Sequence, residues 1–161
     1  MTWDPRTREE RRKSLREYGE KFDRPVQHML DLDDEFPSVD MFGPQSISAE
    51  VGPGWVELLR PALRALSLLG GKVGQIKQKF GGLRFYWDPP EEMRAKWQAW
   101  HDGGRQGQSP YELSPLYTQT SLAVHLAEEL SWSTCELCGV DIGRRSGPTW
   151  RVRCKNCEDK R

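Results

Sequence analysis

The strongest helical signal in the chain is a run of apolar residues spaced three and four apart between residues 55 and 69. Its members are Trp55, Leu58, Leu59, Ala62, Leu63, Leu66 and Leu69. This spacing places them on one face of an α-helix, so the segment is predicted to pack that face against a core. Gly70 and Gly71 follow directly and are expected to end the helix. Pro61 lies inside the pattern and is expected to kink the helix or to mark its true start.

The N-terminal third of the chain combines one charged helix with a long irregular stretch. Residues 7–22 open with Thr7 and Glu10, the two positions of a capping box, so a helix is expected to begin there. Its apolar stripe consists of Leu15, Tyr18 and Phe22. Because this stripe is narrow, the helix must gain its stability by docking on another part of the molecule. Residues 23–54 contain proline or glycine at several positions and are predicted to be mostly irregular.

Two further helices are predicted in the C-terminal half. Residues 88–92 have the pattern of a helix N-terminus, an aspartate followed by two prolines and two glutamates, and that helix is expected to end at Gly103. Residues 103–118 are predicted to form a loop. A last helix is expected over about residues 120–131, and it leads directly into the first pair of cysteines. It carries Leu122, Leu126 and Leu130 on one side. This helix should therefore fasten the cysteines to the core.

A β-hairpin is predicted over residues 73–87, between the glycine-rich breaks. If residues 81–82, both glycine, form the two-residue turn, Lys79 lies opposite Arg84 and Phe80 lies opposite Leu83, because positive φ costs glycine little. Alternation then assigns one face to the core. That face contains Ile76, Gln78, Phe80, Leu83, Phe85 and Trp87. The other face contains Lys77, Lys79, Arg84 and Tyr86.

The charged face of the hairpin is a candidate anion-binding site. Two cations placed directly across a strand pair repel each other unless an anion, a carboxylate of the protein or water relieves them. The candidate ligand-binding residues are Lys77, Lys79, Arg84 and Tyr86, with Arg151 and Arg153 near the C-terminus. The alternative is that acids elsewhere in the chain, such as the cluster from Asp31 to Glu35, neutralise this face internally.

Net charge and hydropathy exclude several classes of protein. The formal net charge is zero, which argues against a general nucleic-acid binder that relies on a large positive field. The charge is uneven, because residues 23–50 hold seven acids and one arginine whereas residues 141–161 hold seven bases and three acids. No apolar run approaches the roughly 18 residues of a membrane span. Residues 1–21 lack the apolar segment of a signal peptide, so we expect a reducing, cytoplasmic location and no membrane partner.

Four cysteines form two close pairs near the C-terminus, and the chain has no others. They are Cys135, Cys138, Cys154 and Cys157. Two residues between the cysteines of each pair let both sulfurs face a common point, and two such turns complete the tetrahedron that Zn²⁺ accepts. Four sulfur ligands leave no position for water or substrate, so the zinc is expected to hold structure. The alternatives are two disulfides or a redox-active cysteine pair.

These patterns predict an α+β fold. Helices are expected to pack on a short antiparallel hairpin or sheet, followed by a C-terminal knuckle similar to a zinc ribbon. Three segments are expected: residues 1–48 as an N-terminal amphipathic helix with an acidic irregular arm, 49–131 as the α+β core with the hairpin, and 132–161 as the four-cysteine zinc module.

The hairpin and the cysteines together resemble a known group of proteins. The residues concerned are Gly54-Trp55, the segment QIKQKFGGLRFY from Gln75 to Tyr86, Ala127 to Ser131, both cysteine pairs and Trp150. The combination is similar to a family of small, largely uncharacterised bacterial and phage proteins that share a K-x-K-F-G-G-L-R-F-Y segment and a C-terminal cysteine site. The resemblance covers about residues 52–157. It implies a zinc-carrying protein, often encoded near mobile elements, and transfers no enzyme activity.

Two functional hypotheses follow. In the first, a non-enzymatic zinc protein recognises an anionic ligand, a nucleotide or nucleic acid by phosphate pairing and by stacking on Tyr86 or Trp150. Bases around the metal would assist, namely Arg144, Arg145, Arg151, Arg153 and Lys155. In the alternative, a phage or prophage interaction module binds a host protein through residues 1–48 and inhibits defence or transcription machinery. An enzyme is disfavoured because the sequence shows neither an acid–base pair nor an open metal position.

Overall fold

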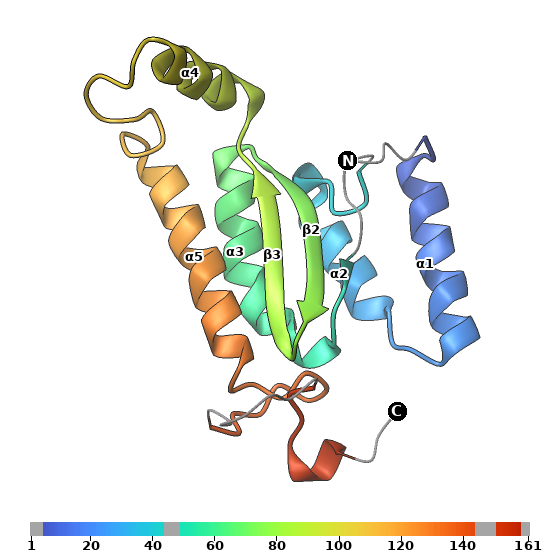
Figure 1. Cartoon of the computed structure of the whole chain (residues 1–161). Helices are drawn as coiled ribbons and strands as arrows, with labels where there is room; N and C mark the ends of the chain where they lie inside the picture. Colours follow the sequence, from blue (N-terminus) through green and yellow to red (C-terminus); the bar gives the residue numbers. More distant parts are fainter. Residues whose placement is uncertain (1–4, 44–48, 144–150, 159–161) are drawn as a thin grey trace.

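The computed structural model describes residues 5–43, 49–143 and 151–158, and it has the α+β fold that the sequence predicts. Its main elements are α1 (Arg8–Phe22), α2 (Gln27–Glu35), β1 (Ala49–Glu50), α3 (Val56–Leu69), β2 (Lys72–Lys79), β3 (Gly82–Asp88), α4 (Glu91–Asp102) and α5 (Pro115–Ser131). Short 3₁₀ helices are η1 (Pro37–Val39), η2 (Pro53–Trp55) and η3 (Lys155–Cys157). Figure 1 shows α3 and α5 on one side of the strands, with α1 and α2 beyond the β1 edge.

One core joins all three predicted segments of the chain. It contains Met29, Leu30 and Leu32 of α2, Leu59, Leu63 and Leu66 of α3, Ile76, Leu83 and Phe85 of the hairpin, Val124 and Ala127 of α5, and Val152. Trp55, which precedes α3, is fully buried among them. The N-terminal and C-terminal segments are therefore not appendages, because each contributes side chains to the same apolar cluster.

The sheet has the order β1-β2-β3, with β1 parallel to β2 and β2 antiparallel to β3. The predicted hairpin register is wrong by two residues: Lys79 pairs with Gly82, and Lys77 pairs with Arg84. The turn is formed by Phe80 and Gly81, whose φ angles of 53° and 82° are those of a type I′ turn. The shift is even, so alternation still assigns the strand residues to the predicted faces. Phe80 is the exception, because it leaves the core face for the turn.

A tryptophan from another element explains why Gly82 belongs to the strand. A Cβ atom added to Gly82 would lie 2.6 Å from the ring of Trp132, just after α5. Gly82 is thus required for close approach of that ring, and the turn moves back by one residue. The outer edge of β3 is closed by the same helix, because Ser131 Oγ and Glu128 Oε1 accept hydrogen bonds from the N–H groups of Leu83 and Phe85 at 2.9 and 2.8 Å.

Three helix predictions need correction. The stretch 23–54, predicted to be mostly irregular, contains α2, whose apolar residues reach the core although no side chain caps its N-terminus. The last helix begins at Pro115, since the Ser114 side chain accepts a hydrogen bond from Tyr117 N at 3.2 Å. α3 begins at Val56, so Pro61 lies within the helix and does not mark its start.

α5 faces the core with a different side from the one that its leucines suggest. The buried residues of α5 are Thr120, Val124, Ala127 and Ser131. Leu122, Leu126 and Leu130 are 56%, 49% and 49% exposed. Small residues on the inner side allow α5 to lie close to α3 and to the edge of β3. The leucines are consequently left on the surface.

The predicted capping box of α1 is confirmed, and the helix docks by charge. Glu10 accepts a hydrogen bond from Thr7 N at 2.6 Å, and Thr7 Oγ1 accepts one from Glu10 N at 3.3 Å. The buried carboxylate of Asp33 on α2 forms ion pairs with Arg12 and, at 2.7 Å, with Arg8 Nη2. Asp33, which belongs to the predicted acidic arm, therefore holds α1 against α2.

Candidate metal centre and basic hairpin face

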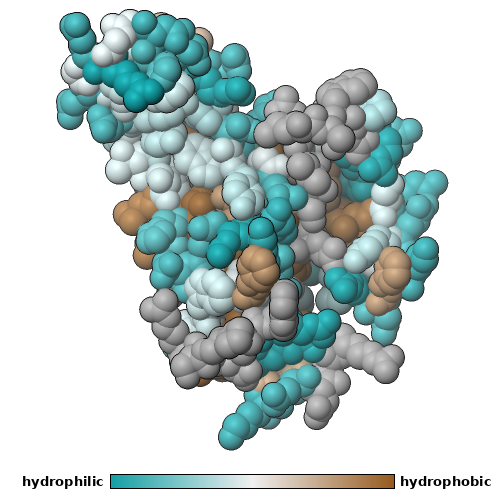
Figure 2. Space-filling model, viewed as in Figure 1, coloured by the Kyte–Doolittle hydropathy of each residue, from teal (hydrophilic) through white to brown (hydrophobic). Residues whose placement is uncertain are grey.

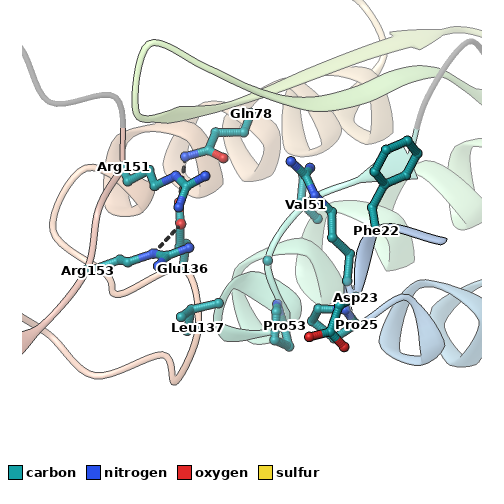
Figure 3. A pocket seen from close by; sticks show the side chains of 12 residues that line it. Phe22, Asp23, Pro25, Val51, Pro53, Gln78, Glu136, Leu137, Arg151 and Arg153 are labelled. Atoms are coloured by element: carbon teal, nitrogen blue, oxygen red, sulfur yellow. Dashed lines mark hydrogen bonds and ion pairs between the residues drawn. The ribbon is translucent and has the colours of Figure 1, made fainter. Parts of the chain in front are cut away.

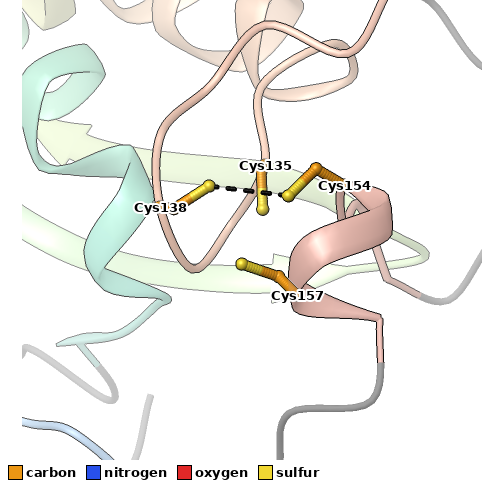
Figure 4. A group of neighbouring side chains, drawn as sticks. All are labelled: Cys135, Cys138, Cys154 and Cys157. Carbon is orange, nitrogen blue, oxygen red and sulfur yellow. Dashed lines mark hydrogen bonds between the residues drawn. The ribbon is translucent and has the colours of Figure 1, made fainter.

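The four cysteine sulfurs converge on one point, as their spacing predicts (Figure 4). All four lie within 4.8 Å of one another, and Cys138 Sγ is 3.7 Å from Cys154 Sγ. A tetrahedron with Zn–S bonds of about 2.3 Å has edges of about 3.8 Å. The four thiols are free. They are arranged as one cluster, which is the arrangement of a metal site.

Local backbone geometry creates the two turns that carry the sulfurs. In the first, Gly139 N donates to Cys135 O and Cys135 N donates to Val140 O, both at 2.9 Å. Gly139 has a φ of 76°, so a glycine is favoured where the chain reverses. In the second, Cys157 N donates to Cys154 O at 2.9 Å within η3. Each turn brings its two sulfurs to the same side.

The surroundings shift the thiol pKa values in opposite directions. Burial opposes ionisation of Cys135, but backbone N–H groups of Cys154, Cys138 and Leu137 donate to its sulfur and lower its pKa to about 6. Burial and the neighbouring thiols raise the pKa of Cys157 to about 12. Several thiolates cannot coexist in this space without a cation to share their charge. Soft sulfur ligands of this kind select a metal such as zinc.

Two glycines allow the first cysteine turn to dock on the start of α3. A Cβ atom at Gly54 would lie 2.1 Å from Cys135 O, and one at Gly52 would lie 2.1 Å from Glu136 O. Without these Cβ atoms the two segments lie close enough for Gly54 N to donate to Glu136 O at 2.8 Å. The buried Trp55 adds a hydrogen bond from Nε1 to Thr134 O at 2.8 Å. The cysteine cluster, as the candidate metal centre, is thereby joined to the central helix and its core.

Glu136, between the cysteines of the first pair, links the module to the sheet. Its side chain is 4% exposed. Oε1 accepts a hydrogen bond from Arg153 Nε at 2.9 Å, and Oε2 accepts one from Gln78 Nε2 at 2.5 Å. Figure 3 shows this bridge on one wall of a cleft of about 320 Å³. The predicted ligand residue Arg153 is thus paired inside the protein, whereas Arg151 is exposed and lines the cleft.

The remaining predicted ligand residues lie together on the face of the hairpin opposite the core. Lys77 is directly opposite Arg84, Lys79 follows on β2, and Tyr86 on β3 is 50% exposed. The ammonium group of Lys77 lies 5.4 Å from the centroid of the Tyr86 ring. Seen from the side of Figure 1, the surface over the hairpin is mainly polar (Figure 2).

The acidic cluster does not neutralise this face, so the internal alternative is wrong for these acids. Asp33 and Asp34 pair with arginines of α1, and Glu35 accepts from Arg60 of α3 at 2.9 Å. Among the described side chains, Lys77, Lys79 and Arg84 have no carboxylate oxygen within 4.0 Å. Their contacts with described side chains are to aromatic rings and neutral groups, including Gln75 for Lys77 and the Trp132 ring for Arg84. Glu50 of β1 is in register with Lys77.

Sequence reasoning missed three residues that shape these sites. Phe80 forms the turn, Trp132 packs over Gly82, and Glu136 bridges the metal module to β2. The position of Glu136 inside a cysteine pair was a usable signal, but its partners are distant in sequence. Of the other predicted helpers, Lys155 is exposed on η3, and Arg144, Arg145 and Trp150 lie outside the described residues.

In the described part of the chain, no helix is both long enough and apolar enough to cross a membrane. Comparison with protein-family models, with curated proteins and with solved structures gives no match.

Proposed function

We propose that this protein is a non-enzymatic, zinc-braced protein that binds nucleic acid through the open face of its β-hairpin. The observation that carries the proposal is the cross-strand pair of Lys77 and Arg84, which has no carboxylate within 4.0 Å among the described side chains. Like charges placed opposite each other destabilise a sheet. Phosphate groups would relieve that repulsion and gain charge-assisted hydrogen bonds.

The zinc has a structural role in this proposal. Four cysteine ligands would fill its coordination shell, so the metal supplies no site for an attacking water or a substrate. What it supplies is a fixed position for the two turns, which through Glu136 and Gln78 are connected to β2. The chain's own residues carry recognition, with Lys77, Lys79 and Arg84 pairing phosphates and Tyr86 offering a ring.

The test is titration of a fluorescein-labelled 20-nucleotide strand by fluorescence anisotropy at several salt concentrations. The wild-type protein is expected to bind more weakly as salt rises. In Lys77→Ala/Arg84→Ala, affinity should fall, and the slope of log K against log salt should become less steep by about 1.4, or 0.7 for each lost contact with a single strand. Thermal stability should not fall, because the substitution removes two opposed cations.

The matched control removes the same charge elsewhere. Lys13→Ala/Arg94→Ala deletes two exposed cations on α1 and α4 and should leave both affinity and salt slope unchanged. The proposal is wrong if the wild-type protein does not bind at 50 mM salt, or if both double variants bind as the wild type does.

A second candidate function is docking of a host protein, in keeping with the resemblance to phage proteins. The observation that favours it is the row of exposed leucines on α5, namely Leu122, Leu126 and Leu130. Single apolar residues are common on surfaces, but a row at i, i+4, i+8 is typical of helix packing. Co-purification of one host protein with wild type, and its loss with Leu122→Lys/Leu126→Lys, would support this function.

The arm first expected to carry such docking is less suited to it. Residues 1–40 include buried Met29, Leu30 and Leu32, so their deletion would remove part of the core. Loss of a partner from a truncated protein could not be separated from unfolding. The point substitutions on α5 avoid this problem, because the leucines they replace are about half exposed.

A further inference from the structure

The cleft beside Glu136 lies between segments that are distant in the sequence. One wall is the turn between α1 and α2, residues 22–25, and the opposite wall belongs to the four-cysteine module, where Arg151 is exposed (Figure 3). The linker from β1 to η2, residues 51–53, lies between them. The volume, about 320 Å³, is near the lower end of the range of about 300–1,000 Å³ for small-molecule sites. The cleft therefore has room for one small ligand.

The charges that line the cleft favour an anionic ligand. Three arginines and two carboxylates give a net charge of one positive unit, namely Arg24, Arg151 and Arg153 against Asp23 and Glu136. Arg153 and Glu136 pair with each other, so their charges cancel. Arg151 differs, because its guanidinium makes no hydrogen bond or ion pair within the described part of the chain. A guanidinium in this state can bind a phosphate group through two parallel N–H groups.

The wall opposite Arg151 provides an aromatic ring and a carboxylate. The Phe22 side chain lines the cleft and is 53% exposed, and its ring packs on Tyr18 with the two centroids 4.8 Å apart. The carboxylate of Asp23 lies beside Pro25, away from Arg151 (Figure 3). It can accept a hydrogen bond from an amino or hydroxyl group. A ligand that fits this wall therefore has an aromatic ring and a hydrogen-bond donor, both at a distance from its negative group.

We propose that this cleft binds a nucleoside monophosphate, with the phosphate on Arg151 and the base against Phe22. This class of ligand combines a phosphate, a planar aromatic base and amino or hydroxyl donors, and bases stack on aromatic side chains. The site is separate from the basic hairpin face, because Gln78, which lines the cleft, lies on the opposite side of β2 from Lys77. The inference therefore does not depend on the proposed function.

Isothermal titration of the protein with AMP, GMP, CMP and UMP tests this site. At least one of these nucleotides should bind with a Kd below about 1 mM and raise the thermal midpoint. The matching nucleoside, which lacks the phosphate, and inorganic phosphate, which lacks the base, should each bind more weakly. Arg151→Ala should weaken binding by about 10- to 150-fold, the range for one lost hydrogen bond to a charged group. Phe22→Ala should weaken it by about 5- to 150-fold, the range for one stacked base.

Two control variants and one further measurement complete the test. Arg94→Ala removes an exposed arginine of α4, and Phe22→Tyr keeps a ring in the cleft, so both should bind the nucleotide as the wild type does. Bound nucleotide should also slow hydrogen exchange at Arg24 N and Glu136 N, which lie on the two walls. The inference is overturned if none of the four nucleotides binds, if Arg151→Ala binds as the wild type does, or if exchange slows only in the hairpin.

Discussion

Two sets of cations in this protein have contrasting surroundings. Arg12 and Arg153 are buried, and each is paired with a buried carboxylate, Asp33 and Glu136 respectively. Lys77 and Arg84 lie on an open strand face, opposite each other, without a carboxylate within 4.0 Å among the described side chains. The first arrangement joins elements that are distant in sequence. The second leaves these two cations without an acidic partner among the described side chains.

This difference shows why the zero net charge is a poor guide to function. A buried guanidinium is tolerated only when a carboxylate compensates its lost hydration. Three acids of the 23–50 segment, Asp33, Asp34 and Glu35, pair with arginines of α1 and α3 and so do not offset Lys77 and Arg84. Of the other acids in this segment, Asp40 lies 4.0 Å from Lys72 at the far end of β2, and Glu50 of β1 is in register with Lys77. The basic face is therefore a local feature, detectable only when the partners of each charge are known.

Metal removal is expected to lower the stability of the protein more than any other change. It should loosen the region of the Glu136–Arg153 pair beside the cysteines and leave α2, which carries the Asp33–Arg12 pair, unchanged. Treatment with a strong chelator should release one zinc per chain and lower the free energy of unfolding by about 4 kcal/mol or more, the linkage value at a free metal concentration 1,000 times Kd. Hydrogen exchange should then become faster at Gly54 N and Glu136 N, which bond across the cysteine module. The amide of Phe36, the C-cap residue of α2, which donates to Leu32 O, should remain protected.

The metal content of the purified protein is the control for that experiment. A protein that contains no transition metal, or whose thiols are oxidised to one another in the native state, would contradict the assignment. Equal exchange at Glu136 N with and without metal would show that the Glu136–Arg153 pair is held independently of the cysteines.

Removal of Asp33 from the buried Asp33–Arg12 pair should cause the next largest loss of stability. Asp33→Ala removes the buried carboxylate that Arg8 and Arg12 share and leaves Arg12 with the exposed Asp34, so the cost should approach the lower end of the about 3–5 kcal/mol lost when one partner of a buried ion pair is removed. Urea unfolding should show a lower midpoint with an unchanged slope. The control is Asp31→Ala, an exposed aspartate on the same helix, which should change stability by about 0.5 kcal/mol or less. Equal effects of the two substitutions would contradict the role given to Asp33.

Sequence patterns predicted the features that depend on local chemistry. The capping box of α1, the apolar face of α3 and the convergence of two cysteine pairs are each set by residues that are near in sequence. The two faces of the hairpin strands followed from simple alternation, although the register itself was wrong. These signals need no knowledge of the rest of the molecule.

The incorrect predictions have a common cause in contacts between distant residues. Positive φ favours glycine, so Gly81 and Gly82 were the natural turn, but Trp132 needs Gly82 in the strand and Phe80 is forced into the turn. Leu126 is on the surface because the smaller Ala127 lets α5 approach α3. The Glu136–Gln78 contact joins residues 58 positions apart. Such contacts have no local signature in a single sequence.

His28 provides a further test of the rule that buried positive charge requires an acidic partner. His28 on α2 is partly buried, with its Nε2 2.7 Å from Val51 O. Burial lowers its pKa below the ordinary 6.5, although the bond to Val51 and the charge of Asp31 oppose the shift. In the unfolded chain His28 therefore binds a proton near pH 6.5, whereas in the folded chain it binds one only at lower pH. Stability from this group is thus complete above pH 6.5 and is lost as pH falls below it.

Urea midpoints measured between pH 7.5 and 5.5 test this expectation. The wild-type protein should lose stability over the range, and the share due to His28 cannot exceed about 1.4 kcal/mol per pH unit, the limit for one proton. His28→Gln keeps a donor for Val51 O but cannot be charged, so its pH dependence should be weaker by that share. His125→Gln, at an exposed position, should follow the wild type and so control for protonation elsewhere, including at the cysteines. If His28→Gln keeps the full wild-type slope, burial of His28 does not hold it neutral, and charge on this face of α2 must be balanced by Asp31.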